Sequence, residues 1–390
     1  MISRRARRER QENALNRAFD AAGRRNQSVL DLTGANPTLA ELRYPSERIA
    51  DIWQSAWQGT YRVESLGDRR TRELLVDSWY RQRTATDDGD AGRTALTAST
   101  SEAYSFLLKL FCDPADEILV PEPSYPLLQE LAAYEGVKAV PYQLDHGSWE
   151  LDTDSVRRAK SKRTRAVLAV SPNNPTGSVL TRKEWQCLAE LGVAIISDEV
   201  FSCYGKQNAA GHGGETFSAL CCDLDVPVIT LDGLSKRALL PQAKAAWLYL
   251  NGDDKVTGAL MSQLELIADT FLSVSPHAQK AMPALLNVTA EVREQVAKRL
   301  RKNLDLLDAQ LQGSPVSRYS YSAGWYIILR LPAVMDEDEW AIKFLREAQL
   351  KVQPGWFYDI EHGPNIVISL LTHEPLFEVG LERLIHCVKE

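Results

Sequence analysis

The feature that most constrains the fold is the alternation, from about residue 94 onward, of short apolar runs with helical patterns. The runs expected to form buried strands are 117–121, 165–170, 193–196 and 226–231. Helical patterns occupy 101–111 and 127–134, and Thr181 with Glu184 is placed to cap a further helix. Short strands separated by helices predict a mainly parallel sheet with helices on both faces. We therefore expect an α/β fold built in three layers, α/β/α.

The pattern changes after about Gly252, where long amphipathic helices replace the alternation. The clearest helix is expected at 284–311, followed by apolar or helical segments at 324–329, 336–349, 366–371 and a terminal helix to residue 390. A chain of 390 residues is long enough for about two domains. We expect a large domain at 46–275 and a smaller α+β domain at 276–390.

Composition excludes several classes of protein. The formal net charge of −7 argues against nucleic-acid binding, and no apolar run approaches the roughly 20 residues of a membrane span. The six cysteines are scattered without metal-type spacing, so reduced thiols in a cytoplasmic enzyme, with no metal site, are expected.

The N-terminal 25 residues are basic, with five arginines between positions 4 and 10. A solvated helix or arm that packs on a partner subunit is the favoured interpretation. An RNA- or membrane-binding tail is disfavoured because the cluster is short and contains Glu9 and Glu12.

Three polar residues follow the predicted strands. Asn174 lies in the loop after 165–170, Asp198 ends the strand at 193–196, and Lys236 follows the strand at 226–231. The carboxyl ends of parallel strands meet at one edge of a sheet, where ligands bind. Each residue has an ordinary alternative: Lys236 as a surface lysine, Asp198 as a helix cap or ion pair, and Asn174 as a turn residue. Together they supply the amine, carboxylate and amide that a pyridoxal phosphate site requires.

The order and wording of these motifs resemble the class I and II aminotransferases, the fold-type I pyridoxal phosphate enzymes, from about Leu30 to the C-terminus. The resemblance implies that residues 1–45 form an N-terminal arm and part of the small domain. It also implies a Schiff base between pyridoxal 5'-phosphate and Lys236, with Asp198 holding the protonated ring nitrogen and Asn174 bonding the ring hydroxyl. Tyr125 matches the aromatic residue that stacks on the ring, although an ordinary packed aromatic is an equal alternative for it.

The resemblance also indicates how the phosphate is held. Ser99, Thr100 and Ser101 open a helix, whose N-terminus suits an anion, and Ser235 adds a hydroxyl. Lys244 stands where the family usually has an arginine on the phosphate, which keeps the charge but loses the bidentate fork. Tyr61 matches a tyrosine that reaches the phosphate of the neighbouring subunit, which implies a homodimer with shared active sites.

Two further positions depart from the family. Phe201 stands where a tyrosine meets the ring hydroxyl, and Tyr204 lies nearby in sequence. Val367 stands where most relatives carry an arginine that grips the substrate α-carboxylate. Another cation then holds the carboxylate, or the substrate presents a different group there.

The function expected is that of a pyridoxal phosphate-dependent aminotransferase, acting between a small-molecule amino donor and a keto acid. A lyase, decarboxylase or cyclase on the same fold is the alternative, favoured by Phe201, Lys244 and Val367. A non-catalytic binding module is disfavoured because both Lys236 and Asp198 are present.

Overall fold

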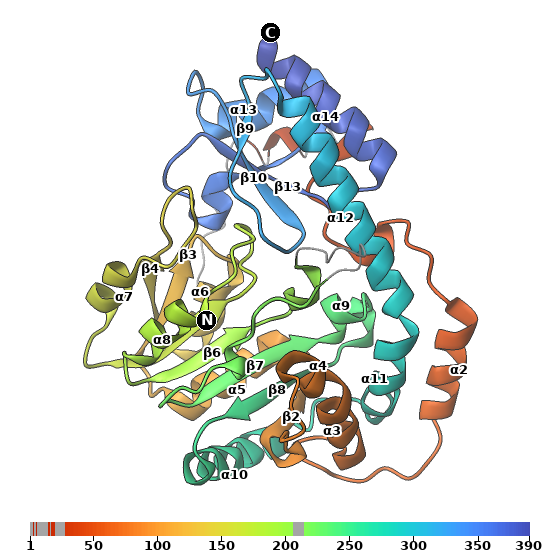
Figure 1. Ribbon diagram of the computed structural model, residues 1–390, viewed down its shortest axis with the longest axis vertical. Helices are drawn as coiled ribbons and strands as arrows, with labels where there is room; N and C mark the ends of the chain where they lie inside the picture. Colours follow the sequence, from red (N-terminus) through yellow and green to blue (C-terminus); the bar gives the residue numbers. More distant parts are fainter. Residues whose placement is uncertain (1–2, 4, 6–14, 16, 20–27, 206–213) are drawn as a thin grey trace.

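A computed structural model describes residues 3, 5, 15, 17–19, 28–205 and 214–390. Its centre is a seven-stranded sheet in the order β2-β8-β7-β6-β5-β3-β4, in which only β8 runs antiparallel to its neighbours (Figure 1). The strands are β2 (Thr94–Thr97), β3 (Glu117–Glu122), β4 (Lys138–Gln143), β5 (Thr164–Val170), β6 (Ala194–Asp198), β7 (Val228–Gly233) and β8 (Ala246–Asn251). The predicted α/β class with a mainly parallel sheet is confirmed.

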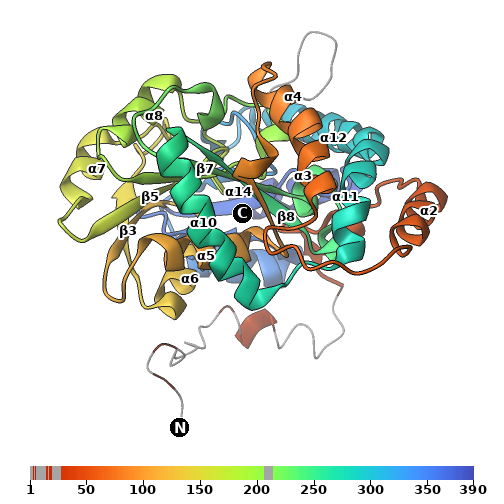
Figure 2. The same ribbon diagram turned by 90° about the horizontal axis from the view of Figure 1, so that it is seen from below.

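Helices cover both faces of this sheet (Figure 2). One face packs on α5 (Thr100–Phe111), α6 (Leu127–Glu135) and α10 (Asp254–Phe271). The other face packs on α7 (Thr153–Ala159) and α8 (Arg182–Ala189). Side chains alternate between the faces as strand geometry requires: Leu168 contacts the first set of helices, whereas Val167 and Ala169 contact the second.

Local sequence signals set the helix starts. The Ser99 hydroxyl accepts from the backbone N–H of Glu102, which fixes the N-terminus of α5. Thr181 and Glu184 form the predicted capping box at the start of α8.

A further layer of helices packs beside β8. It contains α2 (Ser46–Ala56), α3 (Arg69–Leu75), α4 (Arg81–Thr84) and α11 (Pro276–Val288). Apolar side chains of α2, α3, α11 and residues 76–80 cover Trp247 and Tyr249 of β8, so the antiparallel strand is buried on this side as well.

The C-terminal part forms its own sheet, in the order β12-β13-β10-β9 (Figure 1). Its strands are β9 (Ser317–Arg318), β10 (Tyr326–Arg330), β12 (Gln353–Pro354) and β13 (Asn365–Ser369). The helices that pack on it are α12 (Ala290–Leu311), α13 (Glu337–Lys343) and α14 (Glu374–Lys389). The chain near the N-terminus joins this part, because β1 (Leu30–Asp31) pairs in parallel with β11 (Leu350–Lys351).

The single helix predicted at 284–311 is wrong. The chain forms two helices, α11 and α12, that meet at Thr289. Thr289 has φ −92° and ψ 7°, and its hydroxyl donates to the carbonyl of Leu285 at 2.8 Å. A threonine that bonds the preceding turn competes with the helix ladder, and a hydrophobic period alone does not reveal such a break.

The basic N-terminal arm predicted for the first 25 residues lies largely outside the described residues. In the part of the chain that is described, no helix is both long and apolar enough to cross a membrane.

Candidate active site

A cavity of about 390 Å³ opens at the carboxyl edge of the central sheet. The ends of three strands meet there: Val170 of β5 is paired with Asp198 of β6, and Asp198 with Leu231 of β7. Nine of the residues proposed from the sequence line it, namely Ser99, Thr100, Ser101, Tyr125, Asn174, Asp198, Ser235, Lys236 and Lys244. Segments from five parts of the chain therefore converge on one volume, which is of the size that small-molecule sites have.

Asp198 is a buried carboxylate, 8% exposed, at the end of β6. The Tyr104 hydroxyl donates to its Oδ2 at 2.5 Å, and the backbone N–H of Val200 donates to its Oδ1 at 3.2 Å. Burial raises the pKa of Asp198 to about 6, although these two hydrogen bonds lower it. No ion pair to Asp198 occurs among the described residues, so the carboxylate suits a cationic ligand atom.

The nearby arginines are already paired with other carboxylates, so the ordinary alternative for Asp198, an ion pair with an arginine, does not apply. Arg83 binds Glu199, and Arg237 binds Asp232 at 2.6 Å. Both arginines also bind Glu215, and together they overcome the effect of burial and lower the pKa of Glu215 to about 2. This network holds Glu199 and Arg237, the sequence neighbours of Asp198 and Lys236. The side chains of Asp198 and Lys236 take no part in it and line the cavity.

Lys236 lies in the short helix α9 (Leu234–Arg237), directly after β7. Its Nζ lies 4.8 Å from the ring centroid of Trp325 and 5.4 Å from that of Phe201. Burial lowers the pKa of Lys236 to about 8, and the charge of Asp198 opposes that shift. About a tenth of the amine is therefore uncharged at pH 7, far more than for an ordinary lysine, and the uncharged amine is the form that acts as a nucleophile.

Asn174 carries an unsatisfied polar atom. Its Oδ1 is buried and has no hydrogen-bond partner within the described chain. A buried amide oxygen that lacks a donor at a cavity wall fits a ligand that bears a hydroxyl or an N–H group there.

Several lining residues are suited to an anion. The helix α5 begins at Thr100, and the hydroxyl-bearing residues Ser99, Ser101 and Ser235 line the cavity with it. Lys244 adds a positive charge and adopts a left-handed backbone with φ 49°. This set of donors fits a phosphate.

The lining also contains aromatic side chains. Tyr125, Phe201 and Tyr326 line the cavity, and the ring centroids of Phe201 and Tyr326 lie 6.4 Å apart. Tyr204 does not line the cavity, because it is buried and its hydroxyl donates to the carbonyl of Lys236 at 2.6 Å. Tyr204 therefore does not present to the cavity the hydroxyl that Phe201 lacks.

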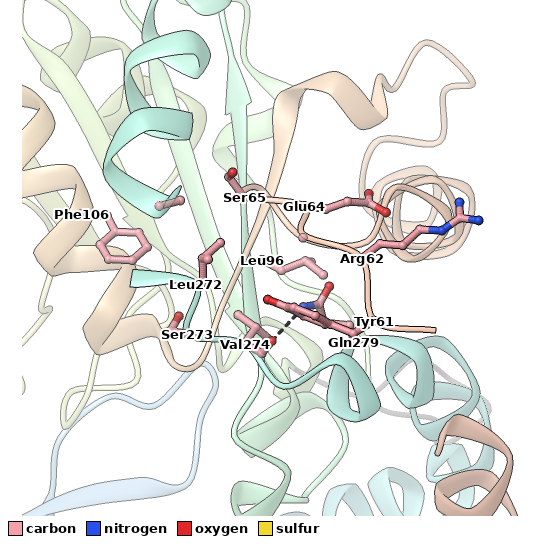
Figure 3. Close-up of a pocket in the computed structure, with 12 residues that line it drawn as sticks. Tyr61, Arg62, Glu64, Ser65, Leu96, Phe106, Leu272, Ser273, Val274 and Gln279 are labelled. Carbon is pink, nitrogen blue, oxygen red and sulfur yellow. Dashed lines mark hydrogen bonds between the residues drawn. The ribbon is translucent and has the colours of Figure 1, made fainter. Parts of the chain in front are cut away.

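Tyr61 lies elsewhere. It is 61% exposed and borders a different, small hollow with Val274 and Gln279 (Figure 3). Its segment is fixed at two points, because Gln279 accepts from the backbone N–H of Asp68 at 2.6 Å and Ser65 donates to Asp269 at 2.6 Å. Within one chain, Tyr61 does not reach the cavity.

Two tyrosines that line the cavity were missed by the sequence reasoning. Tyr104 lies four residues after Thr100, so both occupy one face of α5, and that spacing could have indicated it. Tyr326 comes from β10 of the C-terminal sheet, and no local signal relates it to the strand ends of the large sheet.

These residues fit pyridoxal phosphate. The amine of Lys236 suits its aldehyde, the unpaired carboxylate of Asp198 suits its ring nitrogen, and the N-terminus of α5 suits its phosphate. The unsatisfied amide of Asn174 suits its ring hydroxyl.

Comparison with known proteins independently indicates the aminotransferase class I and II family. A family model described as aminotransferase class I and II matches residues 67–376. An S-alkyl-thiohydroximate lyase of Arabidopsis thaliana is 26% identical over 94% of this chain and 81% of its own length. A probable aminotransferase of the same plant is 26% identical over 86% of this chain and 76% of its own.

Among solved structures, an alanine aminotransferase from Pyrococcus furiosus superposes with a TM-score of 0.87 at 23% identity, covering 100% of both chains. At this identity the likeness establishes the fold, and the family match over residues 67–376 establishes membership. The chain is an enzyme of the aminotransferase class I and II family, whose members depend on pyridoxal phosphate, and pyridoxal phosphate is its cofactor.

Proposed function

We propose that this chain is an aminotransferase that moves an amino group from an amino acid or a related amine to a keto acid. The observation that carries the proposal is the single cavity that joins Lys236, Asp198 and the N-terminus of α5. When bound, pyridoxal phosphate supplies an aldehyde carbon for amines and a ring that withdraws electrons from the substrate carbon.

The residues of the chain have distinct tasks in this proposal. Lys236 holds the aldehyde carbon. Once a substrate amine replaced it at that carbon, the free Lys236 amine would accept and return the proton of the substrate carbon. Asp198 keeps a proton on the ring nitrogen, which stabilises charge developing on the substrate.

The other lining residues bind and orient. Asn174 bonds the ring hydroxyl, while Ser99, Thr100, Ser101, Ser235 and Lys244 bind the phosphate. Tyr125 covers the ring face, and with Phe201 and Tyr326 it keeps water from the reacting carbon.

The proposal includes a homodimer with shared active sites. Tyr61 is exposed and outside the cavity of its own chain, as a residue that serves a neighbouring subunit would be. Trp57 and Val63 on the same segment are 73% and 59% exposed, which is unusual for large apolar side chains on a surface that stays uncovered. We also propose that the enzyme is cytoplasmic and that its domains divide after residues 45 and 275.

A lyase, decarboxylase or cyclase is the second candidate. Phe201 and Lys244 at the cofactor, with Val367 in place of an arginine, favour it, and one relative is named as a lyase. Each of these substitutions changes how cofactor or substrate is held, without removing Lys236 or Asp198.

Two measurements test the proposal. Borohydride should fix the cofactor on Lys236, and peptide mapping that finds the adduct on another lysine contradicts the assignment. With an amino donor and no acceptor, an aminotransferase releases about one carbonyl product per site and stops. Continued product release without an acceptor identifies the lyase class instead.

A further inference from the structure

The cavity contains few cations for a substrate. Among the lining residues the only cationic side chains are Lys236 and Lys244, and no arginine lines it in the described part of the chain. If Lys236 holds the aldehyde and Lys244 the phosphate, no cation of this chain remains to bind a substrate carboxylate.

The wall next to the reacting carbon is apolar instead. Lys236 Nζ lies 5.4 Å from the ring centroid of Phe201, which lines the cavity, and 4.8 Å from that of Trp325, which is fully buried and does not line it. A substrate group beside Lys236 would therefore meet the ring of Phe201. Tyr326 extends this wall, and its ring lies 6.4 Å from that of Tyr358. Leu128 and Val200 add aliphatic surface to the same cavity.

The layer behind this wall is apolar as well. Val367 is 1% exposed and belongs to the cluster that includes Ile328, Tyr358 and Ile360, with Tyr326 packed against it. β13 therefore sends no charged side chain from this position toward the cavity. A carboxylate in such surroundings is left without a partner, which is costly, whereas an aromatic ring packs well there.

We propose that the amino donor is a primary amine with an aromatic or large apolar group and no carboxylate on the carbon that bears nitrogen. The inference rests on the proposed function. In the reaction, the C–N bond of the donor breaks and nitrogen stays on the cofactor carbon, which is reduced by two electrons. The donor carbon is oxidised by two electrons and leaves as an aldehyde, whose oxygen comes from water.

The test uses pairs of compounds that differ only in the carboxylate. The holoenzyme is mixed with 2-phenylethylamine or L-phenylalanine, and with ethylamine or L-alanine, and single-turnover release of the carbonyl product is measured. We expect kcat/KM to favour 2-phenylethylamine over L-phenylalanine at least tenfold. Equal values, or a preference for L-phenylalanine, overturn the inference.

Binding gives a second readout that does not depend on turnover. On borohydride-reduced enzyme, whose cofactor no longer reacts, 2-phenylethylamine should raise the melting temperature more than L-phenylalanine does at equal concentration. The reverse order contradicts the inference, because it requires a cation that the described lining residues of this chain do not supply beyond Lys236 and Lys244.

A variant distinguishes loss of the aromatic contact from a general loss of stability. Tyr326→Leu should lower the selectivity for 2-phenylethylamine over ethylamine by about tenfold, because the ring contact is lost. Tyr319→Leu is the matched control, since Tyr319 is in the same part of the fold but does not line the cavity. Unchanged selectivity in Tyr326→Leu rejects the aromatic contact.

Failure of the inference is distinguishable from failure of the proposed function. If reconstituted protein has no visible cofactor band or no borohydride adduct on Lys236, the proposed function is wrong and the inference falls with it. If both are present and L-phenylalanine is preferred, only the inference is wrong.

Discussion

Tyr104 gives the sharpest quantitative prediction, because it bonds the carboxylate that we assign to the cofactor ring. Tyr104→Phe removes one hydroxyl and keeps the ring, which is 4% exposed in the core beneath the cavity. Asp198 then retains only the backbone N–H of Val200 as a donor among the described residues.

The magnitude follows from the pKa of Asp198. A hydrogen bond to a charged group contributes about 1.5–3 kcal/mol, which corresponds to a pKa rise of about one to two units when it is lost. Starting from about 6, the pKa of Asp198 in the apoenzyme should rise to about 7–8. The cofactor-bound state needs Asp198 ionised, so binding must then expel a proton that the wild-type carboxylate has mostly lost at pH 7.

The sign and the pH window are set by this linkage. At pH 7 the expulsion of this proton costs about 0.4–1.4 kcal/mol of binding free energy, which is about a two- to tenfold loss of affinity. At pH 9 Asp198 is ionised in both apoenzymes and both holoenzymes, so the loss should nearly vanish. The lost hydrogen bond then destabilises the free and bound states equally.

The assay titrates apoenzyme with pyridoxamine phosphate, which forms no covalent bond to Lys236, and follows tryptophan fluorescence at pH 7 and 9. Tyr142→Phe is the control, because that buried tyrosine donates to the carbonyl of Leu168 at 2.9 Å, away from the cavity. Equal losses at both pH values, or no loss at pH 7, would refute the reasoning.

Four further predictions follow from the same geometry. Asp198→Asn should keep the fold and lower kcat/KM about 10²–10³-fold, because an amide cannot hold the proton on the ring nitrogen. Near-normal turnover of this variant would contradict the role of Asp198. The rate of pyridoxal phosphate attachment to apoenzyme should rise with pH around a midpoint near 8, the pKa of Lys236, and a midpoint near 10 would show that burial does not depress that pKa. Mixed Tyr61→Phe and Lys236→Ala subunits should give an activity distinct from either parent, and its absence argues against a shared site. Val367→Arg should lower the melting temperature and the native activity, since the buried cation lacks a partner; a stable variant with improved turnover of alanine or aspartate would indicate an ordinary α-amino acid site.

Much of this site was predictable because it depends on strand ends. The parallel strands β5, β6 and β7 bring Asn174, Asp198 and Lys236 to one edge, and the periods of short buried strands are visible in sequence. The N-terminus of α5 was predictable for a similar reason, since Ser99 is a local capping signal.

Other features depended on tertiary packing. The antiparallel strand β8 lies between β7, which it follows in the chain, and β2, which is far from it in sequence. No local sequence pattern predicts that β2 and β8 are neighbours. The break at Thr289 depends on a side-chain bond that hydrophobic periodicity does not record.

The sequence by itself determined the fold class and the reacting groups, because strand periodicity and the residues after each strand are local properties. Only the tertiary structure decided what surrounds those groups. Tyr104 meets Asp198 across 94 positions, Tyr326 arrives from another sheet, and Tyr61 remains outside the cavity. Such contacts depend on how distant elements pack, and the pKa values of Asp198 and Lys236 depend on that packing in turn.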